Sequence, residues 1–369
     1  MNDTSLPCLP LELKYEIISY MDKDTLVAAA RTCFALSQEA ERYLYQDVKL
    51  SNKQIEKFFK SLSRCNSRAS LVRKCTIVGF GQDDRRFINQ VLVALHNLRS
   101  LAIIPPPLEE APGNDMVFSW SSLLDGCEFK LVEFITSLEC DLSMVEFLHR
   151  QSQIQKYIHS GYTITDTHSA LHPLTLPSLT HFYGNIMDID MIVPHRPVTH
   201  VTVDETVATI GLPLFILQPL AASKGPVKYL SLSLCDMATA SVLSLIYPYT
   251  PHLIGLSLSY PRDVFSLEAE LDWADALAKF RNLKYLEIEV SLDSSGESKD
   301  IPFDCQKELV HTWHDACPSL QSVSFGSQLQ EETEFGLEMN VGAMISSWEK
   351  EKGNWVRMDM RRDDLCWRW

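Results

Sequence analysis

Residues 227–234 read VKYLSLSL, a short phrase in which an apolar residue is followed by another after three positions and then by others at every second position. Alternation with a period of two is typical of a β-strand, whose successive side chains point to opposite faces. Val227, Leu230 and Leu232 are therefore expected to face a core. One such strand buries little apolar surface by itself, so the phrase indicates a fold only if it recurs.

The same phrase recurs along most of the chain. Clear copies begin at Val72, Leu98, Val198, Leu253, Leu283 and Leu320, and weaker copies begin at Leu131, Ile154 and Leu179. Neighbouring copies lie about 19 to about 37 residues apart, a range that brackets the leucine-rich repeat. Helix-like stretches such as residues 238–249 and 268–280 lie between copies. Strand and helix in alternation predict parallel strands on one face and helices on the other.

We therefore predict an α/β fold with an irregular leucine-rich-repeat solenoid of parallel strands and outer helices over residues 49–330. The Asn or Cys that usually closes a repeat turn is clear only at Cys235, so the repeats are expected to vary. A doubly wound α/β enzyme would also alternate strand and helix. Such an enzyme usually carries a phosphate loop or a nucleophile elbow after a strand. The chain offers only the Gly-x-Gly of residues 79–81, which lacks the third glycine.

Tryptophan is concentrated at the C-terminal end of the chain. Trp348, Trp355, Trp367 and Trp369 are four of its 7 tryptophans. A repeat array needs a cap over its last strand, and large aromatic side chains bury much area in few residues. Residues 331–369 are therefore predicted to form an aromatic-rich cap, with a hairpin turn between Trp348 and Trp355. An aromatic cage for a ligand is the alternative.

The first residues predict three short helices. Pro10 stands at a helix start, and Leu13, Ile17 and Met21 then fall on one helical stripe. Asp24 or Thr25 can cap a second helix, and Ser37 lies at or near the start of a third. A unit of about 40 residues usually needs a partner, a metal or disulfides for stability. The apolar surplus of this segment therefore indicates an interface.

Residues 9–50 resemble the F-box, the module that docks on the Skp-type adaptor of cullin-based ubiquitin ligases. The resemblance rests on Leu9, Pro10, Glu12, Ile17, Ile18, the acidic turn at 22–24 and Leu26. Met21 stands where leucine is usual, and Phe34 stands where tryptophan often does. The resemblance implies a three-helix F-box over residues 1–48 that contacts the adaptor through Leu9, Pro10, Glu12, Leu13, Ile17, Met21 and Leu26. A simple helical cap on the repeat domain is the structural alternative.

The polar positions of the predicted strands would share one face. The residues that we single out there are His200, Thr202, Tyr229, Ser231, Ser257, Tyr285 and Glu287. The concave strand face of a solenoid commonly binds a partner. The resemblance to F-box proteins with such repeats implies that this partner is a protein to be ubiquitylated, and the sequence does not identify it. A merely solvated strand face is the alternative.

Charge and cysteine content exclude several classes of protein. A formal net charge of -15 without a Lys/Arg cluster argues against nucleic-acid binding. The most apolar window, residues 207–222, is interrupted by Pro213 and Pro219 and is too short to span a membrane. The 10 cysteines include no C-x-x-C pair, which favours free thiols. We expect no nucleic-acid or membrane partner and a cytoplasmic and/or nuclear location.

Two groups of residues have side chains that could support chemistry. His311, His314 and Cys317 are metal-capable types, and the histidines and aspartates between 181 and 204 form a looser group. Neither group contains a fixed metal spacing or a nucleophile with a paired acid and base. We therefore predict no metal, no cofactor and no enzymatic activity.

The expected function is that of a substrate receptor in a Skp-cullin-F-box ligase. Its mechanism would be proximity, because tethering raises the local concentration of acceptor lysines without new chemistry in this chain. An F-box scaffold that acts with the adaptor outside a ligase is the first alternative. A hydrolase or metalloenzyme on a repeat-like fold is the second.

Overall fold

The computed structural model describes residues 10–32, 34–81, 84–105, 123–161, 171–207, 216–234, 239–261, 273–291, 302–328, 330–332, 338–340, 344–351 and 354–361. The chain forms two compact units, Met1–Ile135 and Thr136–Trp369. Leu9, Cys235, Trp367 and Trp369, for which the sequence makes predictions, lie outside the described residues.

The first unit begins with three helices. They are α1 (Leu11–Ser19), α2 (Lys23–Ala30) and α3 (Phe34–Gln46). Their common core consists of Ile18, Leu26, Ala29 and Ala40. Burial of these four side chains holds three short helices together, since helices of this length are marginal alone in water.

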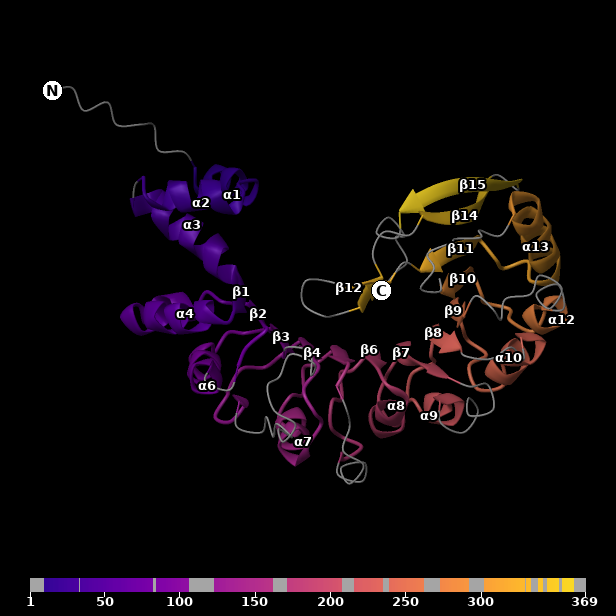
Figure 1. Cartoon of the computed structure of the whole chain (residues 1–369), viewed down its shortest axis with the longest axis horizontal. Coiled ribbons are helices and arrows are strands. Elements are labelled where there is room, and N and C mark those ends of the chain that lie inside the picture. Colours follow the sequence, from indigo (N-terminus) through magenta and orange to yellow (C-terminus); the bar gives the residue numbers. More distant parts are fainter. Residues whose placement is uncertain are drawn as a thin grey trace. The chain divides into compact units, whose positions relative to one another are not determined.

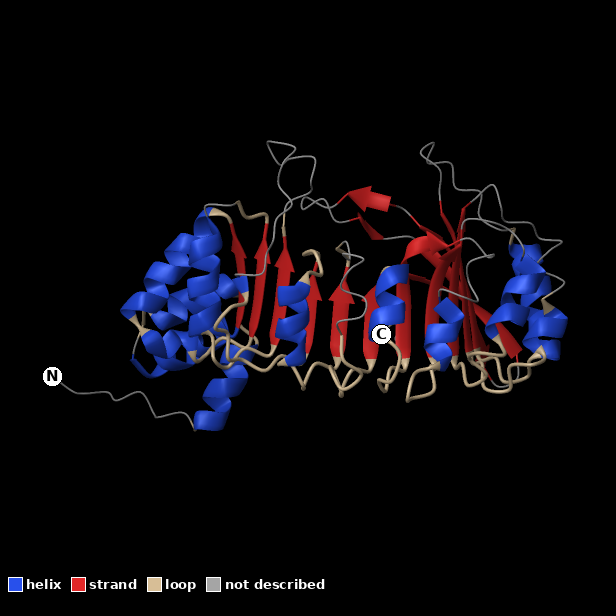
Figure 2. Ribbon diagram, turned by 90° about the horizontal axis from the view of Figure 1, so that it is seen from below, coloured by secondary structure: helices blue, strands red, loops and turns tan. Residues whose placement is uncertain are grey.

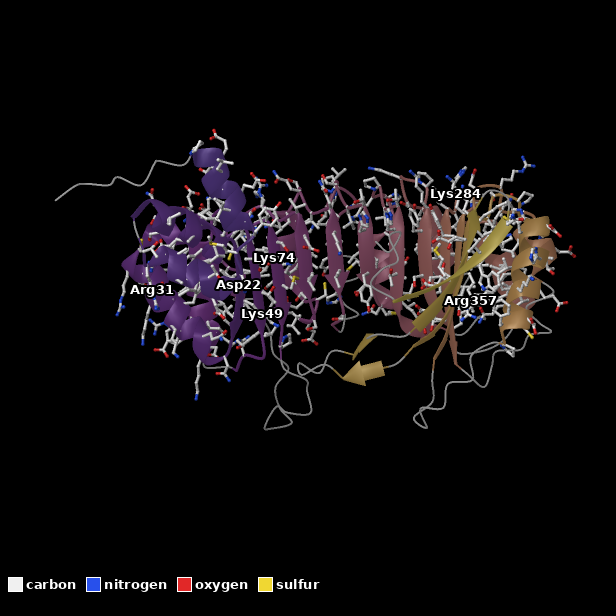
Figure 3. All side chains as sticks on the ribbon, turned by 90° about the horizontal axis from the view of Figure 1, so that it is seen from above. Asp22, Arg31, Lys49, Lys74, Lys284 and Arg357 are labelled. Atoms are coloured by element: carbon white, nitrogen blue, oxygen red, sulfur yellow. The ribbon has the colours of Figure 1, made fainter. Side chains whose placement is uncertain are left out.

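The ends of these helices differ in detail from the sequence prediction. Asp22, labelled in Figure 3, is the N-cap of α2, because its carboxylate accepts a hydrogen bond of 2.8 Å from the backbone N–H of Thr25. The predicted caps Asp24 and Thr25 were wrong, since both already lie inside the helix. The third helix begins at Phe34, ahead of Ser37.

The rest of the first unit alternates strand and helix. Its elements are β1 (Asp47–Ser51), α4 (Lys53–Arg64), α5 (Asn66–Ala69), β2 (Lys74–Val78), α6 (Arg85–Ala94), β3 (Ser100–Ile104) and β4 (Glu133–Thr136), whose last residue begins the second unit. β1, β2 and β3 pair in parallel and in chain order. On β1, Val48 and Leu50 are buried while Lys49, labelled in Figure 3, is exposed.

The second unit repeats the same alternation. Its elements are α7 (Leu142–His149), β5 (Lys156–His159), β6 (His181–Gly184), α8 (Ile186–Ile192), β7 (His200–Val207), α9 (Gln218–Ala221), β8 (Tyr229–Leu234), α10 (Thr239–Ile246), β9 (Gly255–Pro261), α12 (Ala274–Leu277), β10 (Tyr285–Ser291), α13 (Phe303–Ala316) and β11 (Ser322–Gln328). Strands β5 to β11 are parallel neighbours in chain order. In this unit the helices follow one side of the row of strands (Figures 1 and 2).

Every copy of the recurring phrase contains a strand, which confirms the predicted mostly parallel α/β repeat. In β8 the expected inward residues Leu230 and Leu232 are 0% and 1% exposed. The residue before each strand makes the same contact with the preceding repeat: the N–H groups of Ile254, Lys284 and Gln321 donate to the carbonyls of Lys228, Ile254 and Lys284 at 2.7, 2.8 and 2.8 Å. The recurring sequence pattern is thus accompanied by the same backbone hydrogen bond between neighbouring repeats.

The C-terminal segment ends the row of strands with a hairpin. β12 (Gln330–Glu332) pairs with β13 (Glu338–Asn340), while β14 (Met344–Glu351) lies antiparallel to both β11 and β15 (Asn354–Arg361). Trp348 is 3% exposed and its Nε1 donates to Gln306 Oε1 at 3.0 Å. The hairpin predicted between Trp348 and Trp355 is confirmed, and Trp348 serves as a packing residue.

Candidate functional site

Helix α1 carries apolar side chains on two of its sides. Ile18 is fully buried in the three-helix core, whereas Leu13 and Ile17 are 44% and 46% exposed. Tyr20, one turn after Ile17, is 83% exposed, and Val27 of α2 is 39% exposed. A surface helix normally keeps its apolar residues on one stripe that faces the core. A second, exposed group of apolar residues is typical of a protein interaction site.

The residues predicted to contact an adaptor fall into two groups. Pro10, the N-cap of α1, and Glu12 are exposed beside Leu13 and Ile17. Met21 is partly buried and packs on the core, and Leu26 is 6% exposed within it. In this structure Met21 and Leu26 hold the helices together and would support an interface indirectly.

Sequence reasoning missed Tyr20 and Val27 as exposed apolar residues. The signal for Tyr20 was available, because it follows Ile17 by three residues and so lies on nearly the same helical side. Val27 lies two residues before Ala29, which is part of the three-helix core. Only the packing of α2 shows that Val27 faces solvent.

The half-buried polar residues of β5 to β8 form the second candidate surface, which we name the β5–β8 face. Its members are Lys156, His181, Tyr183, His200, Thr202, Tyr229, Ser231 and Ser233. His181, His200 and Tyr229 occupy one register row on adjacent strands. Their rings stack, with centroids 3.9 Å apart for the two histidines and 4.4 Å apart for His200 and Tyr229. The register thus turns residues far apart in sequence into one continuous stack.

Each histidine of the stack is fixed by the threonine before it. Thr199 Oγ1 donates to the carbonyl of Thr180 at 3.3 Å and lies 2.8 Å from His200 Nδ1. Thr180 Oγ1 donates likewise to the carbonyl of Gln155 at 3.1 Å and lies 2.9 Å from His181 Nδ1. A hydroxyl has one proton, so each threonine oxygen either donates to the histidine Nδ1 or accepts from an Nδ1–H. In either arrangement the threonine holds the plane of the imidazole ring in the stack.

The stack is uncharged at neutral pH. Burial, with smaller contributions from the neighbouring His181 and Lys228, lowers the pKa of His200 to about 4. Burial, with a contribution from Lys156, also lowers the pKa of His181. Neutral rings can approach each other face to face without the repulsion that two imidazolium ions would suffer. The β5–β8 face therefore offers an aromatic platform rather than a cationic one.

The strand face of β9 to β11 is not the open polar surface that the sequence predicts. Ser257 is 4% exposed and Glu287 is 2% exposed, and Glu289 is buried as well. Both carboxylates have interaction partners, as buried charges require. Of the predicted contact residues, only His200, Thr202, Tyr229, Ser231 and Tyr285 remain half-buried and accessible.

Four titratable side chains meet inside the second unit. His159 Nε2 lies 2.8 Å from the carbonyl of Leu138, and its Nδ1 lies 2.5 Å from Asp188 Oδ2. Burial raises the pKa of the Cys140 thiol to about 12 and raises the pKa of Tyr157 well above its ordinary value. A nucleophilic cysteine needs a thiolate and a free imidazole nitrogen. Here burial disfavours the thiolate and both imidazole nitrogens have hydrogen-bond partners, so the cluster lacks the arrangement of an activated cysteine.

Two of the three metal-capable residues at the C-terminal end of α13, His314 and Cys317, have other partners. His314 Nε2 lies 2.7 Å from Lys350 Nζ, and burial lowers the pKa of His314. Cys317 is buried and donates its S–H to the carbonyl of Phe280 at 3.1 Å. Over the described residues, no three His, Cys, Asp or Glu side chains cluster as a metal site would require. The helices within the described ranges are also too short or too polar to cross a lipid bilayer.

Comparison with known proteins gives little further information. No family model matches the chain, and no curated protein sequence matches it. Among solved structures, the chain is similar to one described as the crystal structure of the Rad7 and Elc1 complex in yeast, over 84% of this chain and 86% of that one. The sequence identity is 13% and the TM-score is 0.35, which is too low to carry an argument about fold or function.

Proposed function

We propose that this protein is a substrate-recognition subunit of a Skp-cullin-F-box ubiquitin ligase. The observation that carries the proposal is the exposed apolar group formed by Leu13 and Ile17 of α1 and Tyr20 at its C-cap. This group stands beside the F-box-like Pro10 and Glu12. Exposed apolar side chains supported by a small core of their own suit docking on a helical adaptor.

The β5–β8 face is the proposed site for the protein target. Aromatic side chains contribute disproportionately to interface energy, and stacked rings lose little conformational entropy on binding. His200 and Tyr229 are the preferred contacts, with Thr202 and Ser231 at the next register position as hydrogen-bonding neighbours. The protein would act by tethering a target near the ubiquitin-donating machinery and would catalyse nothing itself. We propose a cytoplasmic and/or nuclear location for this protein.

The test is capture of a purified Skp-type adaptor, with and without a cullin, by the full chain. The L13D/I17D double variant places two carboxylates in the exposed apolar group, and binding is expected to weaken at least tenfold. The matched control is L142D/L174D, since Leu142 and Leu174 are 63% and 69% exposed in the second unit. The control is expected to bind normally.

Three results separate the possibilities. Normal adaptor binding by L13D/I17D, with the fold intact by circular dichroism, would overturn the docking proposal. Adaptor binding without cullin recruitment would favour the scaffold that acts outside a ligase. Loss of binding in the control as well would show that the effect is general rather than local to α1.

A further inference from the structure

A pocket of about 410 Å³ opens in the first unit, and its lining residues belong neither to α1 nor to the β5–β8 face. Its walls come from the last turns of α3, the turn between α5 and β2, and the turn before β3. The lining residues are Arg42, Gln46, Ser70, Leu71, Arg73 and Asn97. All of them except Leu71 are polar, two carry a positive charge, and none is acidic.

Hydrogen bonds between the walls hold the pocket in shape. Arg73 Nη1 donates to the carbonyl of Asn97 at 3.0 Å, and Asn97 Nδ2 donates to the carbonyl of Ser70 at 2.9 Å. The backbone N–H of Arg73 donates to the carbonyl of Gln46 at 3.0 Å, which joins the strand side of the pocket to the end of α3. The pocket is therefore built by residues from three separate segments and keeps its form without a ligand.

Neither arginine of the pocket forms an ion pair with a carboxylate of the described chain. Arg42 lies over the ring of Tyr15, 5.8 Å from its centroid, and the guanidinium group of Arg73 donates to the carbonyl of Asn97. The nearby Arg68, by contrast, is paired with Glu41 at 2.8 Å. Although the chain has a formal net charge of -15, the described residues thus offer no carboxylate partner to the two guanidinium groups that line this pocket.

We propose that this pocket binds a phosphoryl group. A guanidinium group presents two parallel N–H donors that match phosphate oxygens, and two such groups balance a dianionic phosphate. The exposed amide of Gln46 adds a neutral donor at the same wall. The volume falls in the range of roughly 300–1,000 Å³ typical of small-ligand sites, so it can hold a phosphoryl group with an organic part attached. The proposal does not depend on the ligase function.

The test is a calorimetric titration of the full chain, carried out separately with inorganic phosphate, O-phosphoserine and serine at constant ionic strength. Both phosphate compounds are expected to bind and serine is not. Stronger binding of O-phosphoserine would indicate a phosphorylated side chain or ester as the ligand, and equal binding would indicate free phosphate.

Variants locate the site. R42Q/R73Q is expected to weaken phosphate binding at least tenfold, whereas the control R64Q/R86Q, with the same change of charge at two exposed arginines of the same unit, is expected to bind normally. Because Arg73 also supports the pocket wall, Q46E provides a second test that leaves both arginines in place. Its carboxylate lies one helical turn from Arg42 and would occupy the site, so phosphate binding should again be lost.

Three outcomes would overturn the proposal: no phosphate binding by the wild type, equal binding by wild type and Q46E, or equal losses in R42Q/R73Q and R64Q/R86Q. The last of these would show a general effect of net charge. Melting temperatures of all variants distinguish loss of the site from loss of the fold.

Discussion

The imidazole ring of His200 stacks on that of His181 with the centroids 3.9 Å apart and the planes inclined by 16°. The two residues are direct register partners on β7 and β6. Tyr229 of β8 continues the stack on the other side of His200. His200 is thus enclosed between two rings, with Lys228 and Lys156 as the cations that affect the stack.

This stack predicts a pH dependence of stability. The pKa of His200 is about 4 in the folded protein, whereas that of an unfolded histidine is about 6.5. Between these values the unfolded chain binds more protons, so the free energy of unfolding falls as the pH drops from about 6.5 towards about 4. Above pH 6.5 the contribution is fully present. When the pH is lowered from 7 to 5, the melting temperature of the H200Q variant should therefore fall by less than that of the wild type.

His252, an exposed histidine of the same unit, provides the control for this measurement. The H252Q variant is expected to follow the wild-type pH profile of melting temperature. Equal pH profiles for H200Q and wild type would show that the stack does not control this dependence.

Substitutions of Leu26 and Leu13 should differ in their effect on stability. Leu26 is 6% exposed in the three-helix core and Leu13 is 44% exposed on α1. L26A is expected to cost about 2–5 kcal/mol of unfolding free energy through the lost contacts and the cavity. L13A should stay within about 0.5 kcal/mol of wild type, as exposed substitutions usually do. Urea denaturation of the full chain measures both, and similar losses for the two variants would contradict the assignment of α1 as a two-sided helix.

Arg196 is predicted to be a major stabilising residue of the second unit. Its side chain is 1% exposed and donates to the backbone carbonyls of His172, Thr175, Met191, Ile192 and Pro194. Burial lowers its pKa to about 10, so it remains charged at neutral pH. R196M would leave these buried acceptors without a donor and should cost about 3 kcal/mol or more.

R196K tests whether the planar fork or only the charge of Arg196 matters. A lysine carries one ammonium group and cannot reach acceptors on several sides at once. Its loss of unfolding free energy should therefore approach that of R196M. A fully stable R196K would show that charge alone suffices.

The pair of His159 and Asp188 shares one proton. His159 Nε2 must donate to the carbonyl of Leu138, so either Nδ1 or the carboxyl of Asp188 carries the second proton. D188N preserves the contact, because an amide N–H can donate to a neutral Nδ1. D188L removes it and should cost about 3 kcal/mol or more, while D188N should cost much less. Chemical denaturation compares the two, and equal losses would contradict the shared-proton arrangement.

The repeated strands could be predicted because their signal is local. In β8 the inward positions Leu230 and Leu232 alternate with Ser231 and Ser233, and alternation of this kind fixes both the strand and its buried side. The hairpin of β14 and β15 was also predictable, since a short polar turn separates two aromatic segments. The cap of α2 was not, because Asp22 and Asp24 are chemically equivalent candidates and only the backbone path selects one.

By itself, the sequence determined the order of strands and helices, the inward positions of the repeats and the apolar excess of α1. Tertiary structure alone decided that Glu287 is buried while Thr202 stays accessible, that His181 meets His200, and that Arg42 and Arg73 line one pocket. The physical reason is the sequence separation of the residues that interact. Periodicity within one strand or helix is set by neighbouring residues, whereas exposure, ring stacking and the convergence of charges depend on segments that the sequence separates by tens of residues.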